Sequence, residues 1–201
     1  MLLRSIALVL ALGGTALAAP GPGTAAVKQA NDTINTLLKQ KVAPGSKDET
    51  ELAQKVTTSV RSFIDIDELG RRAMSDQWSK LTAKQQTEFL ALLRELIEAQ
   101  YVKGLRSNLD YAVKYTDETA DKSGNIDVAT TIETKRKGRP ITIQIDYVLV
   151  KQGPSYKAWD VKTDGVGLVD NYRVMFNKII AKDGFEGLMT KMRDKKKESQ
   201  P

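Results

Sequence analysis

The chain of 201 residues contains neither cysteine nor histidine. These absences exclude disulfides, thiolate nucleophiles, Ser–His pairs and the usual zinc ligand sets. Any catalysis would therefore have to come from Asp, Glu, Lys, Tyr or Arg. The hydrophobic content of 41% and charged content of 28% are ordinary for a globular protein. The length suits a single domain whose core is large enough to fold without covalent cross-links.

Apolar runs long enough to cross a membrane are also lacking. The one continuous apolar run near the start, Ile6–Leu12, follows a single charge at Arg4 and precedes the small-residue site Ala16–Ala18. This order predicts a cleaved secretory signal peptide over residues 1–18. The mature protein is expected to be exported and soluble, with a disordered lead-in at residues 19–23.

The formal net charge is +6, and much of the excess lies near the C-terminus. Lys191–Glu198 carries five basic residues against two acidic ones. Residues 191–201 are predicted to form a frayed, solvated basic tail. Weak attraction to an anionic lipid surface or to an acidic partner is the alternative. No nucleic-acid-binding motif is present, so nucleic acid is not an expected partner.

Apolar residues at helical spacing predict the first half of the chain to be helical. Helices are expected over 24–42 and 47–64, followed by a short helix capped by Asp65 or Asp67. The pattern T-A-K-Q from Thr82 to Gln85 is a capping box. It predicts a long helix that begins there and runs to about Ser107.

The spacing of apolar residues then changes to two, which is typical of strands. Three expected strands begin near Tyr111, Ile126 and Ile141, and a fourth contains Trp159. Short turns join them, so we expect a curled, four-stranded antiparallel sheet with one apolar face. After Gly165 the helical spacing returns, Gly184 is a predicted stop, and a last short helix follows. The fold class is therefore α+β, in one domain over residues 24–190.

The apolar faces of the sheet and the helices must cover a shared interior. Either side chains fill this interior, or the curled sheet and the helices enclose a cavity, and periodicity does not distinguish the two. The candidate cavity-lining residues are Leu93, Leu96, Tyr101, Leu105, Ile132, Ile145, Tyr147, Trp159, Val166, Val169, Tyr172 and Phe176.

Charged residues near these faces suggest few catalytic roles. Arg173 interrupts an apolar helix face and is expected to pair with a neighbouring aspartate, or alternatively to contact an anionic ligand head. Asp146 and Asp160 are possible general bases. Strict alternation, however, places both carboxylates on the polar face, opposite Tyr147 and Trp159. No metal site and no cofactor are expected.

Two stretches of sequence carry recognisable motifs. The first extends from F-I-D at Phe63, through W-S-K-L-T at Trp78 and Q-Q-T-E-F at Gln85, to Tyr101. The second contains D-G-V-G-L-V-D-N-Y-R from Asp164 to Arg173, then Phe176. Both resemble the MlaC-type family of periplasmic phospholipid-binding proteins, also called the toluene-tolerance auxiliary family. The resemblance covers nearly the whole mature chain, although Gly167 stands where the family often has serine.

The resemblance implies a cone-shaped fold similar to that of nuclear transport factor 2, with a pocket that holds phospholipid acyl tails. It further implies a monomeric carrier that shuttles lipid across the periplasm. Its expected partners are an inner-membrane lipid ABC transporter complex and an outer-membrane lipoprotein complex. Two alternatives remain open: an exported hydratase or isomerase of the same fold, and an adaptor protein with a filled core.

Overall fold

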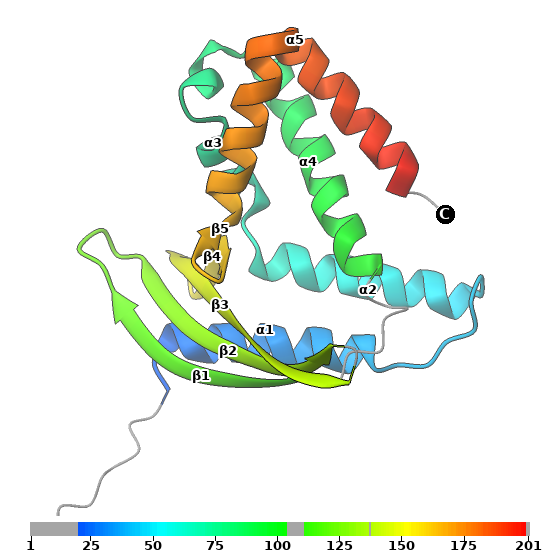
Figure 1. The fold of residues 1–201 in the computed structure, drawn as a ribbon, viewed down its shortest axis with the longest axis vertical. Helices are drawn as coiled ribbons and strands as arrows, with labels where there is room; N and C mark the ends of the chain where they lie inside the picture. Colours follow the sequence, from blue (N-terminus) through cyan, green and yellow to red (C-terminus); the bar gives the residue numbers. More distant parts are fainter. Residues whose placement is uncertain (1–19, 104–110, 137, 200–201) are drawn as a thin grey trace, which may run out of the picture.

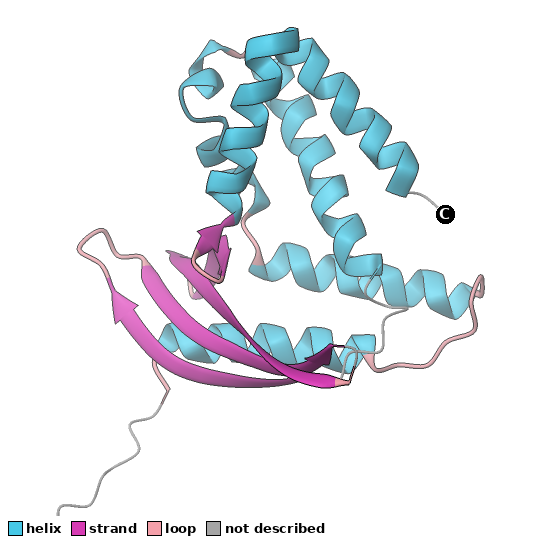
Figure 2. Cartoon of the chain, in the orientation of Figure 1, coloured by secondary structure: helices cyan, strands magenta, loops and turns pink. Residues whose placement is uncertain are grey.

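The computed structural model describes residues 20–103, 111–136 and 138–199 and has an α+β architecture (Figure 1). Helices gather on one side of a strongly curved antiparallel sheet (Figure 2). The α+β class is confirmed, although the sheet has five strands instead of four. The elements are, in order, α1 (Pro22–Leu38), α2 (Lys47–Phe63), α3 (Ile66–Met74), the 3₁₀ helix η1 (Ser75–Lys80), α4 (Ala83–Lys103), β1 (Tyr111–Ala120), β2 (Ile126–Arg136), β3 (Arg139–Gln152), β4 (Ser155–Thr163), β5 (Val166–Gly167) and α5 (Leu168–Ser199).

Local capping residues start α2, α3 and α4. The Ser46 hydroxyl accepts a hydrogen bond from Glu49 N–H at the start of α2. Asp65 accepts one from Glu68 N–H at 3.0 Å at the start of α3. The predicted capping box at α4 is confirmed, because Gln85 N–H donates to Thr82 Oγ1 at 3.3 Å and Thr82 N–H donates to Gln85 Oε1 at 3.0 Å. These caps satisfy backbone donors that have no partner inside a helix.

The start of α1 is capped from a distant strand. The carboxylate of Glu118 in β1 accepts hydrogen bonds from Gly23 N–H at 3.2 Å and Thr24 N–H at 2.7 Å. Gly23 and Thr24 are buried, and α1 already includes Pro22. The expectation of a disordered lead-in is therefore wrong for residues 22 and 23.

The sheet has the strand order β1-β2-β3-β4-β5, with every neighbouring pair antiparallel. The predicted turn between β1 and β2 is present, since Asp121 Oδ1 accepts from Ser123 N–H and Asn125 N–H. β2 and β3 pair without a register shift, and Ile132 lies opposite both Val113 and Ile143. Side chains two residues apart therefore share one face along both strands. The face that α1 covers is called the inner face below.

A bulge in β4 changes the predicted faces of that strand. Leu149 pairs with Ala158 and Val148 with Asp160, so Trp159 is the additional residue. Asp160 is only 5% exposed and accepts hydrogen bonds from Val161 N–H at 2.9 Å and Val169 N–H at 3.1 Å. The placement of Asp160 on an exposed polar face is therefore wrong. Its carboxylate lies buried at the start of α5, where it satisfies a helix donor.

The C-terminal segment is helical. α5 extends to Ser199 with a kink at Gly184, which has φ 69° and marks the predicted helix stop. Beyond the kink Met192 is 6% exposed, and the Lys196 ammonium lies 2.7 Å from the Glu95 carboxylate in α4. The prediction of a frayed tail is therefore wrong for residues 191–199, which are helical and are held to the other helices by Met192 and Lys196.

Two hydrophobic clusters stabilise the fold. The helical cluster joins α2, α3, α4 and α5 and includes Leu69, Phe89 and Phe176. The sheet cluster is smaller and consists of Val27 from α1 with Ile126, Val128, Leu149 and Ala158 from the strands. Phe63 at the end of α2 packs against both clusters.

Candidate ligand-binding site

The inner face of the sheet is buried at one end and open at the other. Val128 and Leu149 are 0% exposed beneath Val27 of α1. Further along the same face the side chains remain only partly buried. We call these residues the open end of the inner face: Val113, Ile132, Ile141, Ile143 and Ile145. A filled core would bury such β-branched side chains, so the residues that the structure describes do not cover this apolar surface completely.

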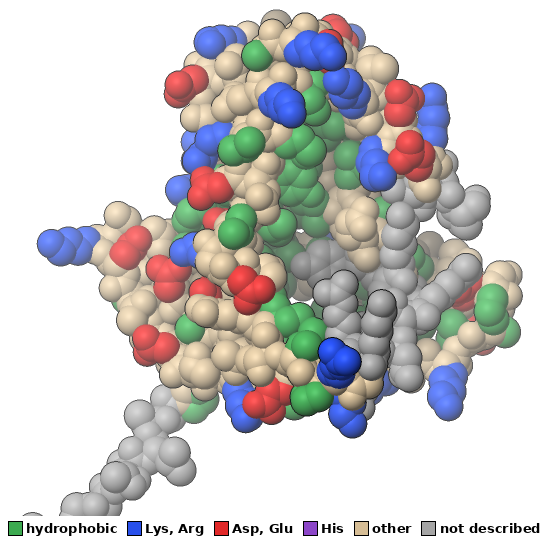
Figure 3. All heavy atoms as spheres, in the orientation of Figure 1, with side chains coloured by type: hydrophobic (Ala, Val, Ile, Leu, Met, Phe, Trp, Pro, Cys, Tyr) green, Lys and Arg blue, Asp and Glu red, His purple; other side chains and the backbone are tan. Residues whose placement is uncertain are grey.

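Several apolar residues of the helices are likewise only partly buried. Ile34, Leu37 and Leu38 in α1, Leu96 in α4 and Phe63 in α2 are partly buried against the helical cluster. The Phe63 ring contacts Tyr147 of the inner face edge-on at 5.9 Å. The space-filling view shows hydrophobic side chains running down between the two halves of α5 into a hollow above the sheet (Figure 3). The described walls of this hollow are thus largely apolar.

A small polar group lies between α1 and the sheet. Asn31 Nδ2 donates to the Tyr115 hydroxyl at 3.3 Å, and the Tyr147 hydroxyl donates to Asn31 Oδ1 at 3.4 Å. Burial raises the pKa of Tyr115 above its ordinary value of 10.0, so its hydroxyl is neutral at physiological pH. One turn along α1, Asn35 Oδ1 is buried without a hydrogen-bond partner among the described residues. These groups would orient a neutral ligand by hydrogen bonds.

The sequence-predicted cavity residues fall into several places. Ile132, Ile145 and Tyr147 lie on the inner face, and Leu96 is partly buried in α4. Leu93, Val169 and Phe176 are at most 3% exposed within the helical cluster, and Tyr172 stacks on Phe176 at 5.3 Å. Val166 is 53% exposed. Tyr101 belongs to α4, but its side chain, like the whole of Leu105, lies outside the described residues.

Trp159 lies on the other side of the sheet from the hollow. Its ring lies 3.9 Å from the Arg72 guanidinium, and its indole Nε1 donates to Asn125 Oδ1 at 3.3 Å. Together with Arg173 and Lys162, these side chains line a depression of about 500 Å³ between α3, β4 and α5. Its cations already have partners: Arg72 pairs with Glu68, Lys162 with Asp127, and Arg173 with Asp170. The expected pairing of Arg173 with a neighbouring aspartate is confirmed.

Sequence reasoning omitted several residues that contribute to the hollow. Val113, Ile141 and Ile143 show period-two spacing, but that spacing does not reveal whether a side chain is fully or half buried. Asn31 could have been noticed, because it interrupts the apolar stripe of α1 between Val27 and Ile34. Phe63 ends a predicted helix, and its contact with Tyr147 depends on the tertiary fold.

Neither a metal site nor a membrane span is found in the described part of the chain. Residues 20–103, 111–136 and 138–199 hold no group of three or more Asp and Glu side chains placed to bind a metal ion. Within the same ranges, no helix is both long and apolar enough to cross a bilayer.

Comparisons with known proteins identify the family. The family model described as "MlaC protein" matches residues 28–194. The chain belongs to the MlaC family. It is 21% identical over 167 residues to the "intermembrane phospholipid transport system binding protein MlaC" of Haemophilus influenzae, covering 83% of this chain and 78% of that protein.

A solved structure has a similar fold. It is the phospholipid-binding protein of Ralstonia solanacearum in complex with a phospholipid, and it superposes with a TM-score of 0.71 at 23% sequence identity. The superposition covers 87% of this chain and 97% of that protein. At this level of identity the match establishes the shared fold.

Proposed function

We propose that the protein is a phospholipid carrier of the periplasm, which holds acyl tails in the hollow and performs no catalysis. The observation that carries this proposal is the open end of the inner face, where apolar side chains in a folded domain are only partly buried. Membership of the MlaC family supports it, as does the bound phospholipid in the Ralstonia protein of the same fold. The predicted signal peptide over residues 1–18 would export the chain.

The energetics explain why an apolar hollow suffices for this task. Each CH₂ group removed from water contributes about 0.8 kcal/mol, so an unshielded acyl chain would cost on the order of 10 kcal/mol. The proposed lipid contacts are Ile132, Ile145, Tyr147 and Leu96, together with Val113, Ile141 and Ile143. Tyr101 and Leu105 remain predicted contacts. The lipid head group would stay near solvent, and the Asn31 group would bond to the polar glycerol region.

As a carrier, the protein would pass lipid between two membrane complexes. By analogy with the family, we expect an inner-membrane lipid ABC transporter complex and an outer-membrane lipoprotein complex as its partners. The two alternative functions have less support. Asp160 is engaged by two backbone donors, which leaves it poorly placed as a general base. A filled-core adaptor would not leave the open end of the inner face only partly buried.

The proposal is tested by purifying the exported protein from the periplasm, extracting it with solvent and identifying the extract by mass spectrometry. We expect diacyl phospholipid in near-stoichiometric amount. An extract without lipid, obtained from protein that unfolds cooperatively, would refute the carrier function and favour the adaptor. A different small molecule in the hollow would favour the enzyme.

A further inference from the structure

The first half of α5 presents apolar side chains to solvent as well as to the core. Val174 is 70% exposed and Met175 is 44% exposed, whereas Tyr172, before this pair, and Phe176, after it, pack into the helical cluster. Residues spaced three and four apart lie on one face of a helix. By this spacing, Asn171, Val174, Met175, Lys178 and Lys182 form one exposed stripe, called here the α5 outer stripe.

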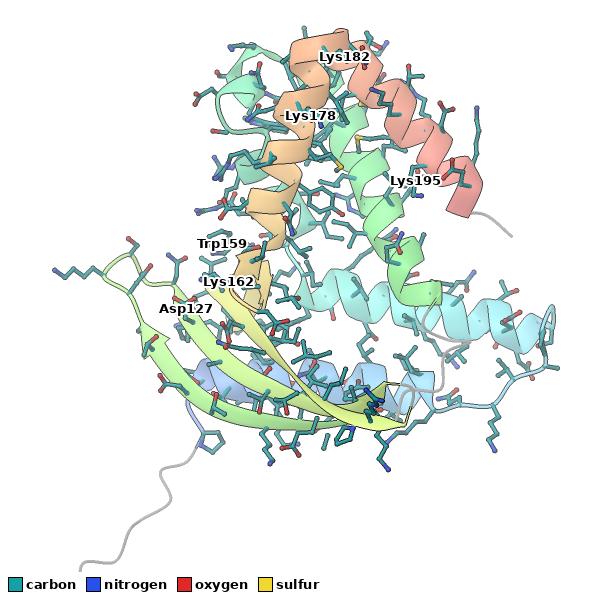
Figure 4. All side chains as sticks on the ribbon, viewed as in Figure 1. Asp127, Trp159, Lys162, Lys178, Lys182 and Lys195 are labelled. Atoms are coloured by element: carbon teal, nitrogen blue, oxygen red, sulfur yellow. The ribbon has the colours of Figure 1, made fainter. Side chains whose placement is uncertain are left out.

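The stripe is positively charged. The segment from Asn171 to Lys182 contains Arg173, Lys178 and Lys182 and neither Asp nor Glu. Among the salt bridges of the described residues, none involves Lys178 or Lys182. Both lysines project from the upper part of the first half of α5 (Figure 4). An exposed apolar pair thus lies beside two lysines that form no salt bridge in the described part of the chain, although Lys182 is near Asp183, whose own salt bridge is with Lys191.

We propose that the α5 outer stripe binds the surface of an anionic phospholipid bilayer. Aliphatic side chains enter the head-group region while neighbouring lysines extend their ammonium groups to the lipid phosphates. The composition favours a bilayer over a protein partner. Protein interfaces are depleted in lysine, and their binding energy concentrates in Trp, Tyr and Arg, none of which belongs to the stripe.

The position of α5 would bring a bilayer bound at the α5 outer stripe close to the hollow. The first half of α5 borders the hydrophobic column that leads into the hollow, and both are seen from the same side of the molecule (Figures 1 and 3). A bilayer bound at the stripe would therefore lie close to the rim of the hollow. This surface goes beyond the proposed carrier function, because lipid could also be exchanged through protein complexes alone.

Vesicle sedimentation tests the proposal with the exported, full-length mature protein. The vesicles contain phosphatidylcholine with or without phosphatidylglycerol. We expect binding to the anionic vesicles, weakened by at least about fivefold for each lysine replaced by glutamate, since the loss of one cation near such a surface removes about that factor and the new carboxylate is repelled. The variant is Lys178→Glu with Lys182→Glu. Its matched control is Lys41→Glu with Lys122→Glu, which changes the net charge equally at exposed positions elsewhere.

The apolar half of the stripe has its own variant, Val174→Ser with Met175→Ser. It should weaken binding to anionic vesicles by at least about threefold at unchanged charge. Equal losses in the stripe variant and its lysine control would overturn the proposal, because net charge alone would then explain binding. No binding of the parent protein, or no effect of the serine variant, would also overturn it. Lipid occupancy after purification is independent of these outcomes, so failure here is distinguishable from failure of the carrier function.

A fluorescent probe gives a second readout. The chain has no cysteine, so Val174→Cys can be labelled uniquely with an environment-sensitive dye. Its emission should shift to the blue on anionic vesicles, whereas a label at Lys122→Cys should not shift. A shift at Lys122→Cys without one at Val174→Cys would place the contact at another surface and refute the proposal.

Discussion

A glutamate at the open end of the inner face should remove lipid without unfolding the protein. Ile143 and Leu149 lie on the same strand and face, but Ile143 is only partly buried, whereas Leu149 is 0% exposed. Replacing Ile143 by Glu forfeits part of one side chain's burial and some strand propensity, about 1–2 kcal/mol in all. Leu149→Glu instead places a charge in a closed core and should cost at least about 4 kcal/mol.

Lipid affinity, unlike stability, should fall strongly in Ile143→Glu. With glutamate at this position, a bound lipid loses the apolar contact of one isoleucine, worth about 1.5–3 kcal/mol. The carboxylate must also give up its hydrating water when the lipid binds. Affinity should therefore fall at least about tenfold for Ile143→Glu. Thr142→Glu is the matched control, because the adjacent residue is exposed and points to the opposite face. It should retain both stability and lipid.

Urea unfolding monitored by circular dichroism measures the first effect, and phosphorus analysis of the purified variants measures the second. If Ile143→Glu destabilises the protein as much as Leu149→Glu, the open end is a closed core and the proposed site is wrong. If Ile143→Glu folds and still carries a full complement of lipid, the acyl tails lie elsewhere.

Three further predictions concern the groups that hold the hollow in place. Burial acts to raise the pKa of Glu118, but hydrogen bonds from Thr24 and Gly23 outweigh it and bring that pKa below the ordinary 4.5. The stabilising contribution of Glu118 is therefore present above pH 4.5 and lost as the pH falls through the lowered pKa. The free energy of unfolding should fall more steeply with acid in the parent than in Glu118→Gln. Parallel curves of this free energy against pH would contradict the prediction. Gly167→Ala would place a Cβ 2.6 Å from Asp160 Oδ2 and should cost about 1–3 kcal/mol in urea unfolding. Combining it with Asp160→Ala should cost less than the sum of the two single changes, whereas additive costs would show that they do not interact. Lipid-free protein should have a free energy of unfolding about 2.7 kcal/mol lower than protein measured with free lipid at 100 times its Kd. An unchanged melting temperature would argue against a bound ligand.

Local signals predicted the elements well where the relevant contacts are local. The capping box at Thr82, the turn after Asp121 and the helix stop at Gly184 all involve residues within a few positions of one another. The period-two spacing likewise predicted which residues of β2 and β3 share a face. A two-residue strand such as β5 is too short to produce any periodic signal.

Errors arose where distant contacts decide the structure. The bulge at Trp159 places its side chain away from the hollow, whereas Asp160 keeps the face opposite Tyr147 that alternation predicts. Asp160 is buried there because α5 begins beside it and Val169 N–H donates to its carboxylate. Residues 22 and 23 are ordered because Glu118, far along the chain, accepts hydrogen bonds from the N–H groups of Gly23 and Thr24. The basic C-terminal segment is helical because Met192 is buried and Lys196 pairs with Glu95. None of these partners is visible in the local sequence.

The hollow itself could not be predicted, because Ile143 and Leu149 have the same residue class, strand and periodicity. Their difference depends on the path of α1 across the inner face. The first half of α1 is held to the sheet by Glu118, by Val27 in the sheet cluster and by the Asn31–Tyr115 hydrogen bond. Only tertiary contacts determine where this cover ends.

The second half of α1 leaves the sheet cluster and joins the other core. Ile34, Leu37 and Leu38 pack against the helical cluster, whereas Val27, only seven residues before Ile34, is buried in the sheet cluster. Because a helix is stiff over this length, α1 fixes the separation between the two clusters and prevents the sheet from closing onto α4. The unfilled apolar surface is therefore a consequence of how α1 is anchored at both ends. Loosening its first half, as in Glu118→Gln, should reduce lipid retention even though Glu118 caps the helix start, well away from the open end of the inner face.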